Sequence, residues 1–484
     1  MSRRAMLGAG VLIAWLAGVA LLIRREYFRP QAERLAEAAT RITPGAVYYG
    51  VMQGDRQVGF ASSTIDTAQA ELTVADYLVA DLPVGGKARR ATARTNVTLT
   101  RALRLKKFDL TLDTEGSPIR ASGTVEGDTI LVIRIASAND SGAPQRIPIS
   151  GSVVLPTIVP LALALGEKPK VGSQYTLPVL DPMSMAARDI AFEVRAESSF
   201  VVYDSSQFNA ATRKWRGVLP DTIHAWKIGN GATQPFGGWV DDQGRIVETS
   251  ELGFTLKRLP YEVAFENWRN DSTHLAVSGD RDILETTAIA ANKKLDSHLT
   301  SLTVRLSNVD LTGFDLNGGR QHFENGVLTI GALPDSLLVA KYLVPQGLNL
   351  DPANTRAEPL LESNDSRIRA QGYKIQWPRR EPEKVAELLN TWVHDSVKDR
   401  ITFGPPDALK VLETRVGDCN EHTQLYVALA RSMGIPARIA AGLAYVDGKF
   451  YYHAWPEVYL RDWVAVDPTF GQFPADAAHL RFIV

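Results

Sequence analysis

The chain has 484 residues, with 53 basic and 54 acidic side chains, 45% hydrophobic residues and a single cysteine. This length is too great for one ordinary domain and predicts about three, each able to bury its own core. The balanced charge gives no electrostatic reason to expect a nucleic-acid or anionic-lipid partner, and one cysteine excludes an intramolecular disulfide.

The first 25 residues predict a membrane anchor. Met6 to Ile23 carries no charge and consists mostly of Leu, Ala, Val, Ile and Gly. As a helix it would be about 27 Å long, enough to cross a bilayer. A cleaved signal peptide is the alternative, but the apolar run is longer than a usual signal core and Leu21 to Arg25 offers no small-residue cleavage site. We therefore expect residues 1–25 to cross the membrane once, although arginines flank both ends and charge does not decide the orientation.

Residues 45–260 predict an antiparallel β-rich domain. Short runs of alternating polarity, such as Val58 to Ile65 and Thr129 to Ile135, are separated by Gly, Asp and Asn turns. Trp239 to Glu248 is typical of a hairpin. Val153 to Leu165 is apolar, but it is short and contains two prolines, so we interpret it as a buried core segment and not as a second membrane span.

Residues 261–345 predict a smaller β-rich module between two larger parts. We expect a helix over Arg281 to His298 and strands over Leu302 to Leu311 and Val327 to Ile330. Proline, glycine, asparagine and aspartate gather in Pro345 to Pro359, which is the best candidate for a linker.

Residues 360–484 form the last predicted domain and contain the only cysteine, Cys419. Glu381 to Val397 predicts a helix whose apolar face includes Trp392, a residue more typical of a core than of an active cleft. A turn at Gly417-Asp418 precedes Cys419, and apolar residues then recur at helical spacing. A helix N-terminus stabilises an anion, so we expect the thiol pKa to be lowered from its free value of about 8.5 and a thiolate to form.

Two predicted turns follow this helix and connect strands that carry further candidate site residues. Asp447-Gly448 is a hairpin signal, Phe450 to Leu460 predicts a strand, and Arg461-Asp462 predicts a second turn. A hairpin folded there places His453 and Asp467 on neighbouring strands, although direct opposition needs a bulge or a longer loop. If this sheet packs against the preceding helix, thiol, imidazole and carboxylate form a nucleophile, a base and an orienting group.

This part of the chain resembles the transglutaminase-like superfamily, whose core is a papain-like cysteine fold. The resemblance covers the last domain and rests on four motifs: Gly417-Asp418-Cys419, Gly434-Ile435-Pro436-Ala437-Arg438, His453-Ala454-Trp455, and Trp463 followed by Asp467-Pro468-Thr469. It implies an α+β fold with Cys419 as nucleophile, His453 as base and acid, and Asp467 as the residue that orients His453. It also implies a membrane-anchored bacterial protein at the inner membrane, with its body on the periplasmic or outer face.

The resemblance further implies thiol-dependent acyl transfer on the amide bonds of a protein or peptide substrate. Backbone N–H groups at the helix start would hold the oxyanion, and His453 would protonate the leaving amine. Water would resolve the thioester in a cysteine protease or amidase, and a lysine amine would resolve it in a crosslinking transamidase; we expect hydrolysis. A membrane-anchored scaffold that binds a cell-envelope partner without catalysis is the remaining alternative.

Other candidate residues fit structural roles. His422 lies one turn after Cys419, where its ring points poorly at the sulfur, and Glu421 in the first turn is stabilising through the helix dipole. Trp455 shares a strand face with His453 and fits either a cleft wall or sheet packing. The sequence has no zinc or calcium pattern and no phosphate-binding glycine loop, so we expect no metal and no cofactor. The remaining histidines show no ligand spacing: His224, His274, His298, His322, His394 and His479.

Overall fold

A computed structural model describes the chain from residue 42 onward, except for residues 69–70, 139, 150, 152, 166–167, 182–185, 230–236, 252, 276, 278–280, 310 and 312. The expected membrane anchor, residues 1–25, lies outside the described residues. Within the part of the chain that is described, no helix is both long enough and apolar enough to cross a membrane.

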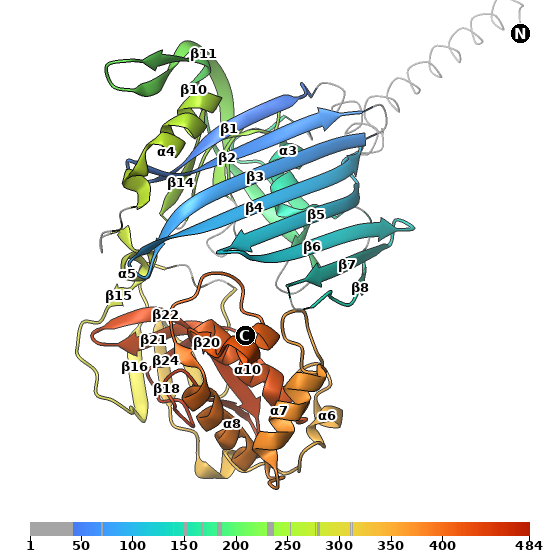
Figure 1. Cartoon of the computed structure of the whole chain (residues 1–484), viewed down its shortest axis with the longest axis vertical. Coiled ribbons are helices and arrows are strands. Elements are labelled where there is room, and N and C mark those ends of the chain that lie inside the picture. The colour runs from blue at the N-terminus through green and yellow to red at the C-terminus, as the bar shows by residue number, and fades with distance from the viewer. Residues whose placement is uncertain are drawn as a thin grey trace, which may run out of the picture.

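The described residues between 45 and 259 contain one antiparallel sheet of fourteen strands (Figure 1). The strand order is β8-β7-β6-β5-β4-β3-β2-β1-β14-β13-β12-β11-β10-β9, so the first and last strands of this region pair with each other in the middle of the sheet. Their bounds are β1 Gly45–Gln53, β2 Arg56–Thr67, β3 Glu71–Val84, β4 Lys87–Thr100, β5 Leu105–Thr114, β6 Ser117–Glu126, β7 Ile130–Ala136, β8 Gln145–Pro148, β9 Gln174–Asp181, β10 Ala186–Asn209, β11 Lys214–Gly229, β12 Gly237–Asp241, β13 Ile246–Glu251 and β14 Phe254–Leu259.

The apolar core of this sheet surrounds one short helix, α3 (Val159–Leu165), which follows the turn η1 (Pro156–Ile158). Leu161 and Leu163 of α3 are buried in one cluster with Leu131 of β7 and Phe192 of β10. Because β7 and β10 lie near opposite ends of the strand order, the sheet must curve around the helix to bring them together (Figure 1). The segment that the sequence marks as a buried core element is therefore buried.

Short helices and a three-stranded sheet follow. Their bounds are η2 Glu262–Glu266, α4 Asn267–Asn270, η3 Ser272–Leu275, α5 Ile283–Thr287, β15 Ile289–Ala290, β16 Ser301–Arg305, β17 Gln321–Glu324, β18 Val327–Gly331, η5 Asp335–Leu337 and α6 Gly347–Leu350. The helix expected over Arg281 to His298 is wrong in extent, because only α5 is helical and the chain then extends to pair as β15 with β22 (Lys449–Tyr459). The three-stranded sheet buries Leu328 and Ile330 in one cluster with Leu480 near the C-terminus.

Helices packed on a sheet form the C-terminal region. The helices are α7 Ser366–Gln376, α8 Pro382–Ser396, α9 Ala408–Thr414 and α10 Cys419–Ser432, and the remaining strands are β19 Lys398–Asp399, β20 Val416–Gly417, β21 Ala437–Val446, β23 Trp463–Ala465 and β24 His479–Ile483. The sheet order is β15-β22-β21-β24, with β23 paired to β22. Val385 and Leu389 of α8 pack in one fully buried cluster with Leu425 and Leu429 of α10, since each pair is four residues apart on one helix face. A β-rich first region and an α+β last region agree with the expected fold class.

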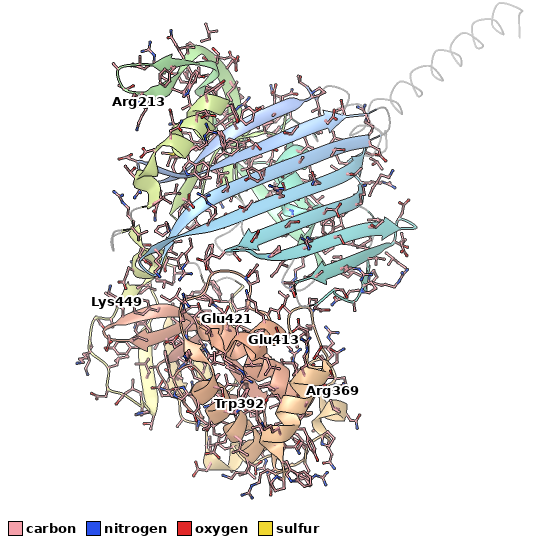
Figure 2. The ribbon with its side chains drawn as sticks, viewed as in Figure 1. Arg213, Arg369, Trp392, Glu413, Glu421 and Lys449 are labelled. Carbon is pink, nitrogen blue, oxygen red and sulfur yellow. The ribbon has the colours of Figure 1, made fainter. Side chains whose placement is uncertain are left out.

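The C-terminal region contacts earlier parts of the chain on both sides of the start of α10. On one side it contacts the large sheet: Arg89 Nη2 donates to the Ile401 carbonyl at 3.0 Å, and Lys410 Nζ donates to Ser117 Oγ at 2.6 Å. On the other side it contacts the segment that follows the sheet, where Lys449 pairs with Glu285 of α5 at 2.8 Å. Figure 2 shows Glu421, in the first turn of α10, on the side of the C-terminal region that faces the large sheet.

Candidate active site

Cys419 is the first residue of α10, and local sequence fixes this helix start. The Asp418 side chain accepts hydrogen bonds from the N–H groups of Asn420 and Glu421, while the Glu421 carboxylate accepts from the Asp418 N–H at 3.0 Å. This reciprocal capping box satisfies N–H groups that the helix cannot pair. Gly417 is required beside it, because a Cβ at that position would lie 2.1 Å from Glu421 Cβ. Burial and the charge of Asp418 raise the pKa of Glu421 to about 7.

His453 and Asp467 are in direct contact. His453 lies on β22, and its Nε2 is 2.7 Å from Asp467 Oδ2. Asp467 does not sit on a paired strand opposite His453: β23 ends at Ala465, and Asp467 opens a turn closed by two hydrogen bonds with Gln472. The longer loop that the sequence required is therefore what brings the carboxylate to the ring.

The Asp467 carboxylate is fully buried and accepts four hydrogen bonds. Oδ1 accepts from the N–H groups of Thr469 and Phe470, at 2.8 and 3.1 Å, and Oδ2 lies 2.7 and 2.8 Å from the Nε2 atoms of His453 and His479. Burial opposes ionisation, but the hydrogen bonds from the two histidines outweigh it and hold the pKa of Asp467 well below its usual range. The carboxylate is therefore ionised, and each histidine must present an N–H to it.

Cys419 reaches the same strand through the backbone of Ala454, the residue after His453. The Ala454 backbone acts on the Cys419 thiol and favours its ionisation, and Thr423, one turn along α10, donates its hydroxyl to the Ala454 carbonyl at 3.0 Å. Since His453 Nε2 carries the proton that faces Asp467, its Nδ1 is the nitrogen with a free lone pair. That nitrogen is the one available to accept the thiol proton.

The expected lowering of the thiol pKa is wrong in this structure. Burial raises the pKa of Cys419 to about 12, and the negative charges of Asp418, Asp467 and Glu421 act in the same direction, while the Ala454 N–H opposes them. The helix N-terminus stabilises a thiolate, but partial burial near carboxylates destabilises it more. The thiol keeps its proton at neutral pH, so a base must remove it during the reaction.

Two aromatic rings hold the plane of the His453 ring. Phe470 stacks on it with ring centroids 4.7 Å apart and an interplanar angle of 5°, and Trp455 lies 6.0 Å away on the same strand. Trp455 is 1% exposed, so of its two expected roles sheet packing is observed. Phe470 is 39% exposed and forms the accessible side of the stack.

His479 is the site residue that the sequence analysis missed. It lies at the start of β24, which pairs with β21, and its second ring nitrogen, Nδ1, is 3.1 Å from Asp476 Oδ1. The only sequence signal is a histidine at the head of a short apolar strand. Its position beside Asp467 depends on β24 pairing with β21, which local sequence does not specify.

The other candidates have structural positions. His422 is buried, with Nδ1 2.7 Å from the Asp418 carbonyl and Nε2 3.3 Å from the Val397 carbonyl, which confirms its expected structural role. Trp392, labelled in Figure 2, packs against the α8–α10 core and carries the Arg415 guanidinium 4.3 Å above its ring.

One group of side chains has the residue types of a metal site. The ligand atoms of His453, Asp467 and His479 lie within 4.8 Å of one another. The two nitrogen-to-oxygen distances of 2.7 and 2.8 Å are shorter than the separation of about 3.3 Å between ligands at the corners of a tetrahedral zinc site. Hydrogen bonds therefore account for the group, and the expectation of no metal stays a prediction.

Comparison with protein families gives one match. The model of the transglutaminase-like superfamily matches residues 371–468, a range that contains Cys419, His453 and Asp467. No functionally curated protein matches the chain.

Solved structures give weaker likenesses. A provisionally assigned cysteine protease from Cytophaga hutchinsonii is 15% identical, over 38% of this chain and 70% of that one, with a TM-score of 0.24. A β-barrel-like protein of a domain of unknown function from Brucella abortus is 13% identical, over 46% and 97%, at 0.31. The periplasmic domain of TgpA from Pseudomonas aeruginosa is 16% identical, over 36% and 72%, at 0.23. Likenesses at these TM-scores support no conclusion about fold or activity.

Proposed function

The chain contains a transglutaminase-like superfamily domain at residues 371–468, and from this premise we propose that it is a thiol-dependent hydrolase of amide bonds in protein or peptide substrates. The observation that carries the proposal is the buried contact of 2.7 Å between His453 and Asp467, close enough to Cys419 for the Asp467 charge to act on its thiol. Cys419 would be the nucleophile, His453 the base and then the acid, and Asp467 the residue that orients His453.

In the first half of the reaction, His453 Nδ1 takes the thiol proton while the sulfur attacks the substrate carbonyl carbon. Because the thiol is protonated at rest, proton transfer and attack are coupled, and the ionised Asp467 stabilises the imidazolium that forms. The capping box uses the N–H groups of Asn420 and Glu421 and leaves that of Cys419 for the oxyanion.

In the second half, the His453 imidazolium gives its proton to the leaving amine, and a thioester remains on Cys419. His453, neutral again, removes a proton from water as the water oxygen attacks the thioester carbon; the bond from carbon to sulfur then breaks, the acid leaves, and His453 returns the proton to the Cys419 sulfur. A lysine amine in place of water would make the same site a transamidase.

We also propose that residues 1–25 attach the protein to the cell inner membrane, with the described residues on the periplasmic or outer face. Met6 to Ile23, uncharged and apolar, supports this placement. The substrate would then be a protein or peptide of the cell envelope.

A thiol-directed covalent probe tests the catalytic assignment, because Cys419 is the only cysteine and all labelling reports on it. We expect wild type to be labelled and His453→Ala to be labelled at least tenfold more slowly, with His322→Ala, an exposed histidine on β17, as the matched control. Equal labelling of His453→Ala and wild type would favour a non-catalytic scaffold.

Product analysis then separates the two fates of the thioester. The full-length chain is incubated with glutamine-containing peptides and a tagged primary amine, and Cys419→Ala serves as the blank. Cleaved or deamidated peptides without tagged product support hydrolysis, and tagged peptides would replace it with transamidation.

A further inference from the structure

We propose that His479 is a positioning residue of this site: held by Asp476 as an imidazolium, it shares Asp467 Oδ2 with His453 and sets the pH at which His453 accepts a proton. This inference rests on the proposed function, since it assigns His453 the role of base. The site then contains two histidines on one carboxylate oxygen, of which one reacts and the other stays charged.

The proton count on His479 follows from its neighbours. Nε2 lies 2.8 Å from Asp467 Oδ2, and Nδ1 lies 3.1 Å from Asp476 Oδ1 and 3.3 Å from the Asp476 carbonyl. All three oxygens are acceptors, whereas a neutral imidazole has only one N–H. Each ring nitrogen of His479 faces a carboxylate oxygen, unlike those of His422, which face neutral carbonyls, so we take both nitrogens of His479 to donate and its ring to be an imidazolium.

Electrostatics agree with this count. Burial lowers the pKa of His479, but its hydrogen bonds to Asp467 and Asp476 outweigh burial, so the pKa is raised. The pKa of Asp476 is lowered, because the His479 contacts and the Ala478 N–H outweigh its burial. Asp476 is itself held in place, since its N–H donates to Gln472 Oε1 at 2.8 Å.

Further charged and aromatic side chains lie close to His479. Arg320, before β17, acts against protonation of His479 and donates to the Ala475 carbonyl. Glu457 of β22 and Arg481 of β24 border the same small cavity, but they pair with each other at 3.3 Å. Trp455 presents an uncharged ring edge at 5.2 Å. The two aspartates that touch the ring therefore dominate.

The charge on His479 acts on His453 at short range. The two rings are 5.6 Å apart, and they share one carboxylate oxygen. A fixed cation there offsets part of the attraction that Asp467 exerts on a proton at His453, so it keeps His453 neutral to lower pH. Two unit charges at this distance and an effective dielectric constant near 20 interact enough to move a titration midpoint by about one pH unit or more.

The test is a pH titration of the full-length chain, selectively labelled with ¹⁵N-histidine, in the presence of a chelator. We compare wild type with His479→Gln, which can still donate to Asp467 but carries no charge, and with His322→Gln as the control. We expect the His453 midpoint to rise by about one pH unit in His479→Gln and to stay unchanged in the control. The midpoint of the acid limb in the pH profile of hydrolysis should shift to higher pH by the same amount. A merely structural role of His479 would lower the rate without shifting this midpoint.

A second variant covers the case in which His479→Gln does not fold. Asp476→Asn leaves the ring in place and removes one anion, so the His479 midpoint should fall. A neutral His479 ring across pH 6–8 in wild type, or an unmoved His453 midpoint in a folded His479→Gln, would overturn the proposal. These midpoints are read without substrate, so they decide the role of His479 even if the chain hydrolyses nothing; hydrolysis that needs Cys419 but ignores His479 would leave the proposed function standing alone.

Discussion

A buried aspartate in each region shows how differently the two regions use charge. Asp241, at the end of β12, accepts from the N–H groups of Gln243 and Arg245 and from the Arg258 guanidinium at 2.9 Å. Asp467 also accepts backbone N–H groups, but its other partners are two histidines. Arginine is permanently charged, whereas histidine exchanges protons near neutral pH. The first arrangement closes a turn, and the second can take part in proton transfer.

The strongest test of this comparison replaces each aspartate by asparagine. We expect Asp467→Asn to lower kcat/KM by about 10³–10⁴-fold, because an amide favours the wrong tautomer of His453. Asp241→Asn should instead leave kcat/KM within twofold and lower the free energy of unfolding by about 1–3 kcal/mol, since it weakens a buried charged hydrogen bond. Kinetics and urea unfolding on both variants measure this, and similar effects from the two would remove the distinction.

The capping box at the start of α10 should position the Cys419 thiol, and a change at Gly417 tests this. Gly417→Ala places a methyl group against Glu421, and we expect it to cost about 1–3 kcal/mol of stability and to lower the rate of Cys419 labelling, because the capping box must shift. The matched control is Gly331→Ala at the end of β18, where a Cβ meets no atom within 4 Å. Normal labelling of Gly417→Ala would show that the cap does not position the thiol.

The buried aspartates of the two regions should also differ in how acid changes their contributions to stability. The folded-state pKa of Asp467 is depressed, so its contribution to stability is present above the ordinary aspartate value near 4 and is lost as pH falls below it. Asp241 has a raised pKa from burial, so acid acts on it in the opposite sense. We expect Asp467→Asn to lose about 1 kcal/mol less stability than wild type between pH 5 and pH 3, measured by urea unfolding. An equal loss would mean that Asp467 is not stabilised as an anion.

The smallest expected effect lies at the exposed contact between β22 and α5. Lys449 and Glu285 form an exposed pair at 2.8 Å, and Lys449→Ala should change stability by less than about 0.5 kcal/mol and leave labelling of Cys419 unaltered. A larger loss in thermal unfolding would show that the packing of α5 against the C-terminal sheet depends on this contact.

Local sequence was sufficient where the interactions are local. Asp418 and Glu421, three residues apart, specify the helix start at Cys419, and Asp447-Gly448 specifies the β21–β22 hairpin. The sequence predicted that His453 and Asp467 lie close together, but it did not predict the geometry of the loop that brings them into contact. The remaining features depend on residues far apart in the chain.

Three features needed the tertiary structure. His479 joins the site because β24 pairs with β21, a contact that its own residues do not encode. The direction of the thiol pKa depends on how packing partly removes Cys419 from water and places it near carboxylates, and a helix terminus alone predicts the opposite sign. The large sheet is joined in its middle by β1 and β14, and their pairing of Tyr48 with Leu259 connects the two ends of this region of the chain.

Intact-mass measurement of an acyl-enzyme tests whether Cys419, His453 and Asp467 act together as nucleophile, base and orienting group. The full-length chain is mixed with an activated acyl ester and quenched in acid within seconds, and the site of any adduct is mapped by peptide sequencing. We expect one acyl group on Cys419 of wild type, and accumulation at least tenfold slower in His453→Ala and Asp467→Asn. An adduct that forms equally fast in all three proteins, or none on Cys419 at all, would contradict this assignment.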